Sequence, residues 1–349
     1  MFTRYPDFAD HELVTCREHS ATGLTAFIAI HNSHLGPAIG GCRILRYPNP
    51  DDAIKDVLRL SRGMTYKSAI GRIPYGGGKA VIVADPATDK TRELLHAMGD
   101  FVESLGGRYI TSFDSGTTLE DVRTIGEHTQ YTAGTLASAG NASTSTAYGV
   151  FQCIQAAIRA RLDRATLDGV HVTIQGVGNV GHRLAKLLSA QGARLTIADT
   201  NPALTQELAG EIGAKVVPSQ DIHRIEADVF SPCALGGVLS ARTIPELGAR
   251  IVVGGANNQL ATQADDQRLL EAGILYCPDY LANAGGIIDL HYQRSGWSRS
   301  AVERHVEGLA ETFQEVMERS RAQQAGTGRI ADELAESRFR APGSLCRPS

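Results

Sequence analysis

Three side chains able to do acid–base chemistry lie beside glycine-rich stretches in the first third of the chain. Lys67 ends MTYK, Lys79 ends GGGK, and Asp114 begins DSGTT. A lysine enclosed in a dry site near a second cation has a lowered pKa and can act as a general base. A nearby carboxyl group can exchange protons with a substrate. Spacing alone does not assign these roles, because most lysines are solvated surface charges.

Two familiar motifs fit these stretches poorly. A phosphate-binding P-loop needs glycine five residues before the Gly–Lys pair and Ser or Thr after the lysine, whereas Ile73 and Ala80 occupy those positions. DSGTT is also similar to the active-site motif of aspartic proteases. Such a protease needs two aspartates that share a proton, and this chain contains one motif of the kind.

A third stretch predicts a dinucleotide-binding turn. The apolar strand VHVTI precedes a G-x-G-x-x-G motif, a helix with apolar Leu184 and Leu188 follows, and the next strand ends at Asp199. The motif consists of Gly176, Val177, Gly178, Asn179, Val180 and Gly181. The first glycine allows the tight turn, the second lets a pyrophosphate approach the backbone and the third lets helix and strand pack. Asp199 would accept hydrogen bonds from ribose hydroxyls and repel a 2′-phosphate, which favours NAD over NADP.

The surrounding pattern predicts an α/β fold with two domains. In the first half we expect strands over 24–31, 80–83 and 108–112, a helix from Asn49 to Gly63, another near 90–105, and a turn-rich segment over 32–41. The second half, with strands near 214–217, 227–234, 249–256 and 273–280, predicts a parallel Rossmann sheet. An amphipathic helix is expected over 301–320. The predicted domains are 1–135 for substrate and 136–325 for the dinucleotide, with a helix after about 325 packing back on the first and a flexible tail over 338–349.

Composition narrows the classes of partner. A formal net charge of −4 provides no basic field for nucleic acid or anionic lipid, and no run of about 18 apolar residues occurs. We therefore expect small-molecule ligands and a cytoplasmic protein. The six cysteines form no C-x-x-C motif, and His31 and His34 have no third ligand nearby. The sequence predicts no metal site.

Seven stretches together resemble the leucine, valine and phenylalanine dehydrogenases, the smaller relatives of glutamate dehydrogenase. They are GPAIGGCR, LRLSRGMTYKSAI, GGGKAVI, QGVGNVG, PCALGG, GANNQL and PDYLANAGG, in order, over about residues 20–320. The resemblance implies NAD-dependent oxidative deamination of an L-amino acid to a 2-oxo acid and ammonium. It also implies a substrate domain, a Rossmann domain with a cleft between them, and a homo-oligomer.

The same resemblance implies roles for individual residues. Lys67 would hold the substrate carboxylate, Lys79 would be the catalytic lysine, and Asp114 would exchange protons with the substrate nitrogen. The other residues that it implies line the substrate pocket or the nicotinamide site; they are Gly40, Gly41, Asn283, Thr146 and Asn257.

Four further positions bear on the choice of substrate by the resemblance: Ile39, Ser112, Ile287 and Leu290. Ile39 and Ser112 favour a narrow pocket and a branched aliphatic amino acid. EDVRTI and GILYCPDY are closer to the aromatic-using branch, so a phenylalanine or tryptophan dehydrogenase stays an alternative. An inactive NAD-binding relative with a regulatory role is a second one. Asp289 stands where relatives commonly have Asn or His, and we expect its side chain to point away from the pocket.

Overall fold

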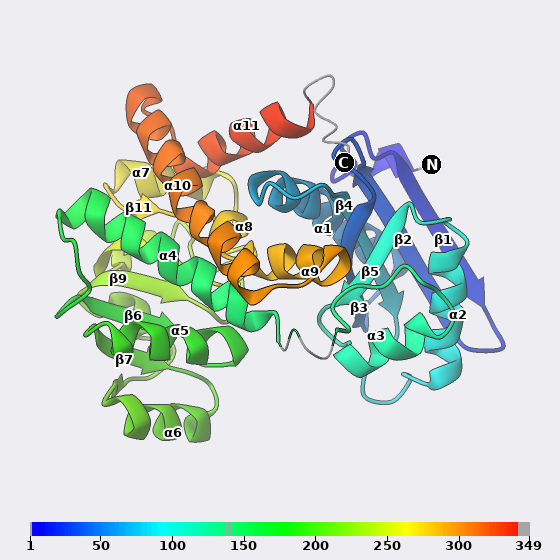
Figure 1. The fold of residues 1–349 in the computed structure, drawn as a ribbon, viewed down its shortest axis with the longest axis horizontal. Helices are drawn as coiled ribbons and strands as arrows, with labels where there is room; N and C mark the ends of the chain where they lie inside the picture. Colours follow the sequence, from blue (N-terminus) through cyan, green and yellow to red (C-terminus); the bar gives the residue numbers. More distant parts are fainter. Residues whose placement is uncertain (1, 137–138, 140, 341–349) are drawn as a thin grey trace. The chain divides into compact units, whose positions relative to one another are not determined.

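The computed structural model of the chain describes residues 2–136, 139 and 141–340, which belong to two compact units (Figure 1). Unit 1 comprises Met1–Gly140, Gln293–Gly296 and Ala335–Ser349, and unit 2 comprises Asn141–Tyr292 and Trp297–Leu334. The division therefore falls after residue 140. Two short pieces from the C-terminal third return to unit 1.

Unit 1 is built on a five-stranded mixed sheet. In chain order its elements are β1 (Leu13–His19), β2 (Leu24–Asn32), β3 (Ala38–Leu45), α1 (Pro50–Ile70), β4 (Gly76–Val83), α2 (Arg92–Glu103), β5 (Tyr109–Phe113) and α3 (Leu119–Gly126). The strand order is β1-β2-β4-β3-β5, with β2 antiparallel to β1 and β4, and β3 parallel to β4 and β5.

Helices cover both faces of this sheet, so its inner strands are mostly apolar. On β2, Ile28 and Ile30 pack with residues of α2 and α3, whereas Phe27 and Ala29 pack with residues of α1. Successive side chains of a strand point to opposite faces, so each strand contributes to two cores. A polar side chain on either face of this sheet is therefore held by well-packed apolar neighbours.

Helix α1 begins as predicted and ends later. The Asn49 side chain accepts the Asp52 amide at 3.0 Å, and Pro50 occupies the first turn. Gly63 does not end the helix, which continues to Ile70 with Gly71 as its C-cap. A side chain at Gly63 would meet no neighbouring atom within 4 Å. A glycine inside a helix costs about 1 kcal/mol, which packing against the sheet outweighs. Lys67 consequently lies in the last turn of a helix.

Two segments read as glycine-rich loops are strands. Residues 38–45 form β3, where a turn-rich segment was predicted up to 41, and Gly76, Gly77 and Gly78 form the start of β4. A Cβ on Gly40 would lie 1.8 Å from the Gly78 carbonyl oxygen. A Cβ on Gly77 would lie 2.0 Å from the Thr65 amide nitrogen. These glycines are needed because two backbone segments pack closely there, and not because the chain turns.

Unit 2 contains a six-stranded parallel sheet of order β11-β10-β9-β6-β7-β8, as the sequence predicted for this half. Its strands are β6 (His171–Gln175), β7 (Arg194–Ala198), β8 (Lys215–Val216), β9 (Ala227–Pro232), β10 (Ala249–Val252) and β11 (Leu275–Tyr276). Its helices are α4 (Ser143–Leu162), α5 (Asn179–Ala190), α6 (Pro202–Ile212), α7 (Ala264–Glu271), α8 (Asp279–Ala282), α9 (Gly285–Ser295) and α10 (Arg299–Gln323). The predicted apolar stripe of α10 is confirmed, since Val302, Val306, Leu309, Phe313 and Val316 are buried.

The last helix, α11 (Thr327–Phe339), leads from unit 2 into unit 1. Arg338 donates to the carbonyls of Ala69 and Ile70, both at 3.0 Å, and Phe339 is buried against Tyr66. The tail predicted from 338 is therefore wrong for these first positions, and 341–349 lie outside the described residues.

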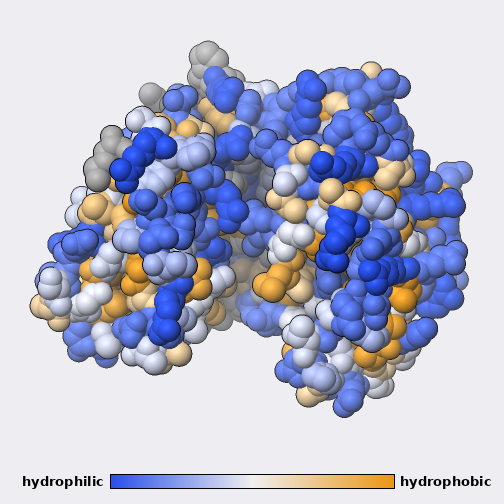
Figure 2. Space-filling view, turned by 180° about the vertical axis from the view of Figure 1, so that it is seen from behind, coloured by the Kyte–Doolittle hydropathy of each residue, from blue (hydrophilic) through white to orange (hydrophobic). Residues whose placement is uncertain are grey.

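The surface in view is mostly hydrophilic, with apolar residues interspersed (Figure 2). Within the described ranges, every helix is too short or too polar to span a bilayer.

Candidate functional site

Lys79 and Asp114 lie on the face of the sheet that α1 covers. Val81 on β4 packs with α1, and Lys79, two residues earlier, points to the same side. Parallel register places Gly41 of β3 beside Ser112 of β5, so Asp114 and Lys79 also meet on this face. The sheet thus brings Lys79 and Asp114 together from strands that are not neighbours.

Lys79 and Asp114 form an ion pair in which the Lys79 Nζ contacts the Asp114 Oδ2. The lysine side chain is 7% exposed and the aspartate side chain 18%. Burial by itself would raise the pKa of Asp114, but the charges of Lys79 and Arg43 and the hydrogen bonds from Lys79 and the Ser115 amide outweigh it. The pKa of Asp114 is consequently lowered to about 2. An ionised pair in a nearly dry site is suited to proton transfer at a substrate.

Glycine next to this pair is required by the packing. A Cβ on Gly41 would lie 2.5 Å from the Phe113 carbonyl oxygen and 2.8 Å from the Asp114 Cβ. The Tyr109 hydroxyl donates to the Gly40 carbonyl at 2.7 Å, which fixes β3 beside β5. Gly41 therefore allows the strand that carries Asp114 to approach β3 closely.

Lys67, Ile39 and Ser112 take different positions in unit 1. Lys67 is half-buried on α1, two residues after Thr65, which packs on Gly77 of β4. Ile39 is fully buried on β3. Ser112 is 2% exposed, and its Oγ has no hydrogen-bond partner within the described part of the chain. A buried hydroxyl without a partner is costly, so it marks a place where a ligand or water would be stabilised.

Arg43 is a residue of this site that the sequence reasoning missed. Its Nη2 lies 3.5 Å from the Asp114 Oδ2, and its Nη1 donates to the Asp56 Oδ2 at 2.8 Å. The signal was available, because Arg43 follows Gly41 by two residues and a strand places both on one face. Reading the segment as a loop concealed this alternation.

In unit 2 the glycine motif forms the predicted strand–turn–helix. Gly176 has φ +93°, and a Cβ there would lie 2.7 Å from the Ala234 Cβ. A Cβ on Gly181 would lie 1.9 Å from the Gly176 carbonyl oxygen. At Gly178, the residue before α5, a Cβ would meet nothing within 4 Å. The protein itself requires the first and third glycines, whereas the space at the second is open.

This open space fits a dinucleotide phosphate. The first amides of α5, a helix that begins at Asn179, receive no side-chain cap from Gly178, and an anion is stabilised at such a terminus. Leu235, the residue after Ala234, is 85% exposed although it is apolar. A bound cofactor that covers this edge would account for both features.

Asp199 lies at the end of β7, as expected for a ribose ligand, and has a second task. Its Oδ2 accepts the Val177 amide at 2.8 Å and its Oδ1 accepts the Asn201 amide at 2.9 Å. The carboxylate therefore holds the glycine turn in place. Each oxygen can accept a further hydrogen bond, so ribose hydroxyls still fit.

Asn257, Asn283 and Thr146 converge in unit 2. The Asn283 Nδ2 donates to the Asn257 Oδ1 at 2.8 Å and to the Gly255 carbonyl at 3.3 Å. A Cβ on Gly286 would lie 2.7 Å from the Thr146 Oγ1, so the segment after Asn283 packs on the start of α4. The buried Asn283 Oδ1 has no hydrogen-bond partner among the described residues, which suits a ligand amide or ammonium.

That Asp289 points away from the pocket stays a prediction. Asp289 is 3% exposed on α9 and accepts the Ser145 hydroxyl at 2.6 Å, so its carboxylate is buried inside unit 2. The prediction assumed the alternation of an extended segment, whereas Gly285–Ser295 is helical. Ile287 is buried and Leu290 half-buried on the same helix.

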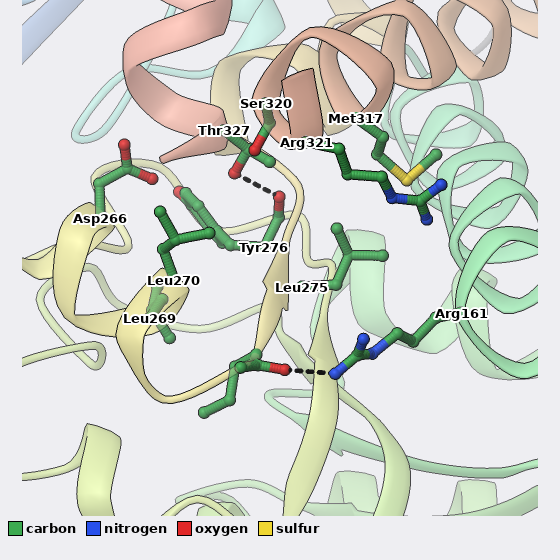
Figure 3. Close-up of a pocket in the computed structure, with 12 residues that line it drawn as sticks. Arg161, Asp266, Leu269, Leu270, Leu275, Tyr276, Met317, Ser320, Arg321 and Thr327 are labelled. Atoms are coloured by element: carbon green, nitrogen blue, oxygen red, sulfur yellow. Dashed lines mark hydrogen bonds between the residues drawn. The ribbon is translucent and has the colours of Figure 1, made fainter. Parts of the chain in front are cut away.

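A cavity of about 140 Å³ lies elsewhere in unit 2. Thr327 donates to the Tyr276 carbonyl and Arg161 to the Gly273 carbonyl at its wall, both at 2.7 Å (Figure 3). None of the predicted site residues lines it, so this cavity is separate from the candidate site. In the described ranges no three His, Cys, Asp or Glu side chains are grouped to hold a metal.

A parallel sheet with an open glycine turn and a second sheet with a buried lysine–aspartate pair are the two parts of a dinucleotide-dependent dehydrogenase. Two family models match the chain. The model described as Glu/Leu/Phe/Val dehydrogenase, dimerisation domain, matches residues 11–136, and that of Glutamate/Leucine/Phenylalanine/Valine dehydrogenase matches 139–210 and 203–336. The chain belongs to the Glu/Leu/Phe/Val dehydrogenase family. It is an oxidoreductase of the amino acid dehydrogenase class.

Individual relatives agree with this assignment. The chain is 44% identical to L-tryptophan dehydrogenase of Nostoc punctiforme, over 94% of this chain and 93% of that one. It is 40% identical to leucine dehydrogenase of Geobacillus stearothermophilus, over 96% and 92%. The crystal structure of the Nostoc punctiforme enzyme superposes with a TM-score of 0.84, covering 95% of this chain and 96% of that chain at 43% identity.

Proposed function

We propose that the protein catalyses the reversible, NAD-dependent oxidative deamination of a branched-chain L-amino acid to its 2-oxo acid and ammonium. The observation that carries this proposal is the buried Lys79–Asp114 pair on the face shared with α1. The nearly complete coverage of a leucine dehydrogenase at 40% identity supports it.

Each side chain has a chemical reason for its role. Lys67 supplies a positive charge that holds the substrate carboxylate and so orients the α-carbon. Lys79, when uncharged, takes a proton from water as the water attacks the iminium carbon. Asp114, which contacts Lys79, accepts hydrogen bonds from the substrate nitrogen and exchanges protons with that nitrogen.

NAD fits the residues of unit 2. The glycine turn and α5 would hold the pyrophosphate, and Asp199 would accept hydrogen bonds from the adenosine ribose. The residues after Asp199 are Thr200, Asn201 and Pro202, none of which carries a charge to bind a 2′-phosphate. When bound, the nicotinamide accepts the hydride from the substrate.

The resemblance assigns Ile39 and Ser112, both buried, to the side-chain pocket, and an isoleucine at the first position supports a small, branched substrate side chain. An aromatic substrate is the second candidate, and the 44% identity to a tryptophan dehydrogenase favours it. We further propose a homo-oligomer, because the family model over 11–136 is described as a dimerisation domain. A cytoplasmic location is part of the same proposal.

The test is a panel of L-amino acids with the purified protein at alkaline pH, following NADH absorbance. Leucine, valine and isoleucine should give the highest kcat/KM, NAD should be preferred to NADP, and glutamate should give little turnover. Highest kcat/KM with phenylalanine or tryptophan would select the second candidate. Absence of turnover with every amino acid would favour an inactive relative instead.

A further inference from the structure

Asp114 faces two cations, of which the family resemblance accounts for one. Its Oδ2 contacts Lys79 from β4 and lies 3.5 Å from the Arg43 Nη2 from β3. Its Oδ1 accepts the Ser115 amide at 2.7 Å. Three groups thus fix the carboxylate, and Arg43 is the one that cannot lose its charge.

Arg43 is itself held from the opposite side. Its Nη1 donates to the Asp56 Oδ2 at 2.8 Å, and the Tyr47 hydroxyl donates to the same oxygen at 2.7 Å. The side chains of Arg43 and Asp56 are 19% and 11% exposed. The guanidinium therefore spans two carboxylates, one on α1 and one at the end of β5, in a geometry that a flexible surface arginine would not keep.

Two cations, Lys79 and Arg43, face two carboxylates, those of Asp114 and Asp56. Their charges sum to zero only while Lys79 is protonated. The proposed reaction requires Lys79 to be uncharged for part of the cycle, and Asp114 would then lose its nearest counterion in a nearly dry site. An isolated buried carboxylate takes up a proton, and the neutral carboxyl group then neither attracts an ammonium group by charge nor accepts a proton from it. A permanent cation prevents this.

We propose that Arg43 is a positioning residue that keeps Asp114 ionised and oriented while Lys79 is uncharged. The inference rests on the proposed function and assigns different roles to the two cations. Lys79 changes its charge during the reaction, and Arg43 does not. Asp114 can then serve the substrate nitrogen throughout the cycle.

The remaining titratable groups near Asp114 do not replace Arg43. Cys42 on β3 and Tyr109 on β5 are fully buried, and burial raises the pKa of Cys42 to about 12 and that of Tyr109 well above its usual value. Both stay neutral at working pH. Without Arg43 the pKa of Asp114 rises, so its protonation, and the accompanying loss of activity, begins at higher pH.

The test compares Arg43→Gln, Arg43→Lys and the control Arg59→Gln in the full-length enzyme. Arg59 contacts the other oxygen of Asp56, at 3.3 Å, and its side chain is 59% exposed. We expect Arg43→Gln to lower kcat by roughly 10- to 100-fold with little change in NAD affinity, and to move the acid limb of the pH profile up by about one unit. Arg43→Lys restores a positive charge without the bridging geometry and should recover part of the loss, whereas Arg59→Gln should behave like wild type.

Wild-type kcat and an unmoved acid limb in Arg43→Gln would overturn the inference. So would equal losses in Arg43→Gln and Arg43→Lys together with equal drops in melting temperature, since that pattern indicates a purely structural role. These outcomes are distinct from failure of the proposed function, which would show as an inactive wild-type protein.

Discussion

Two glycines of the same turn in unit 2 should respond oppositely to one added methyl group. A Cβ on Gly181 would lie 1.9 Å from the Gly176 carbonyl oxygen and 3.3 Å from the Cys233 Cβ, whereas a Cβ on Gly178 would meet nothing within 4 Å. We predict that Gly178→Ala weakens NAD binding at nearly unchanged stability. Gly181→Ala should mainly destabilise the protein.

The magnitudes follow from these surroundings. Gly178 has φ −69° and ψ −154°, which alanine can adopt, so the unfolded-state gain of about 0.4–1 kcal/mol roughly offsets the poorer helix cap. Gly181→Ala forces backbone to move and should cost about 3 kcal/mol. A methyl group that occupies the space of a phosphate should weaken NAD binding by at least about tenfold, or 1.4 kcal/mol.

Urea denaturation and calorimetric titration with NAD measure the two quantities separately. Wild-type protein and both alanine variants are compared at the same salt concentration. The reasoning fails if Gly178→Ala binds NAD as tightly as wild type, or if it loses as much stability as Gly181→Ala.

Three further predictions concern unit 1. Because the pKa of Asp114 is lowered to about 2 in the folded protein, its ionisation contributes roughly 2 kcal/mol of stability above about pH 4, which is lost as the pH falls towards 2. The acid denaturation curve of Asp114→Asn should lack this loss of stability. A curve identical to that of wild type would contradict the ion pair. Ile39→Ala should raise kcat/KM for phenylalanine relative to leucine by about tenfold if Ile39 bounds the side-chain pocket, and a constant ratio would remove it from the pocket. Phe339→Ala should destabilise the protein by about 3 kcal/mol in urea melts, because Phe339 is 3% exposed and packs on Tyr66; a wild-type midpoint would show that this contact contributes little.

Local chemistry predicted the parts of the fold that depend on it. The N-cap of α1 and the strand–turn–helix at Gly176 follow from short-range hydrogen bonding and steric rules. The buried face of α10 follows from its apolar period. In each case the residues that decide the structure are neighbours in sequence.

The two incorrect loop assignments in unit 1 have one physical cause. Gly40, Gly41 and Gly77 were interpreted as loop residues, but they permit close contact between a strand and backbone that is distant in sequence. Tertiary packing decides that use of glycine, and no local pattern reveals it. Missing β3 hid the alternation that places Arg43 beside Asp114, so the second cation of the site appeared only in the structure.

Asp289 illustrates the same limit in unit 2. Its neighbours GGIID do not distinguish a short extended piece from a helix, and the partner that keeps it buried, Ser145, is far away in sequence. A buried aspartate becomes predictable only when its hydrogen-bond donor is known.

The turnover of Lys79→Ala tests the central claim most directly, measured as NADH formation with the best amino acid beside calorimetric NAD affinity. The lysine that contacts Asp114 should be indispensable for chemistry and irrelevant to unit 2, so we predict a loss of kcat of about 1,000-fold or more with NAD affinity within about twofold of wild type. Turnover within about tenfold of wild type would contradict the assignment of Lys79 as the catalytic base.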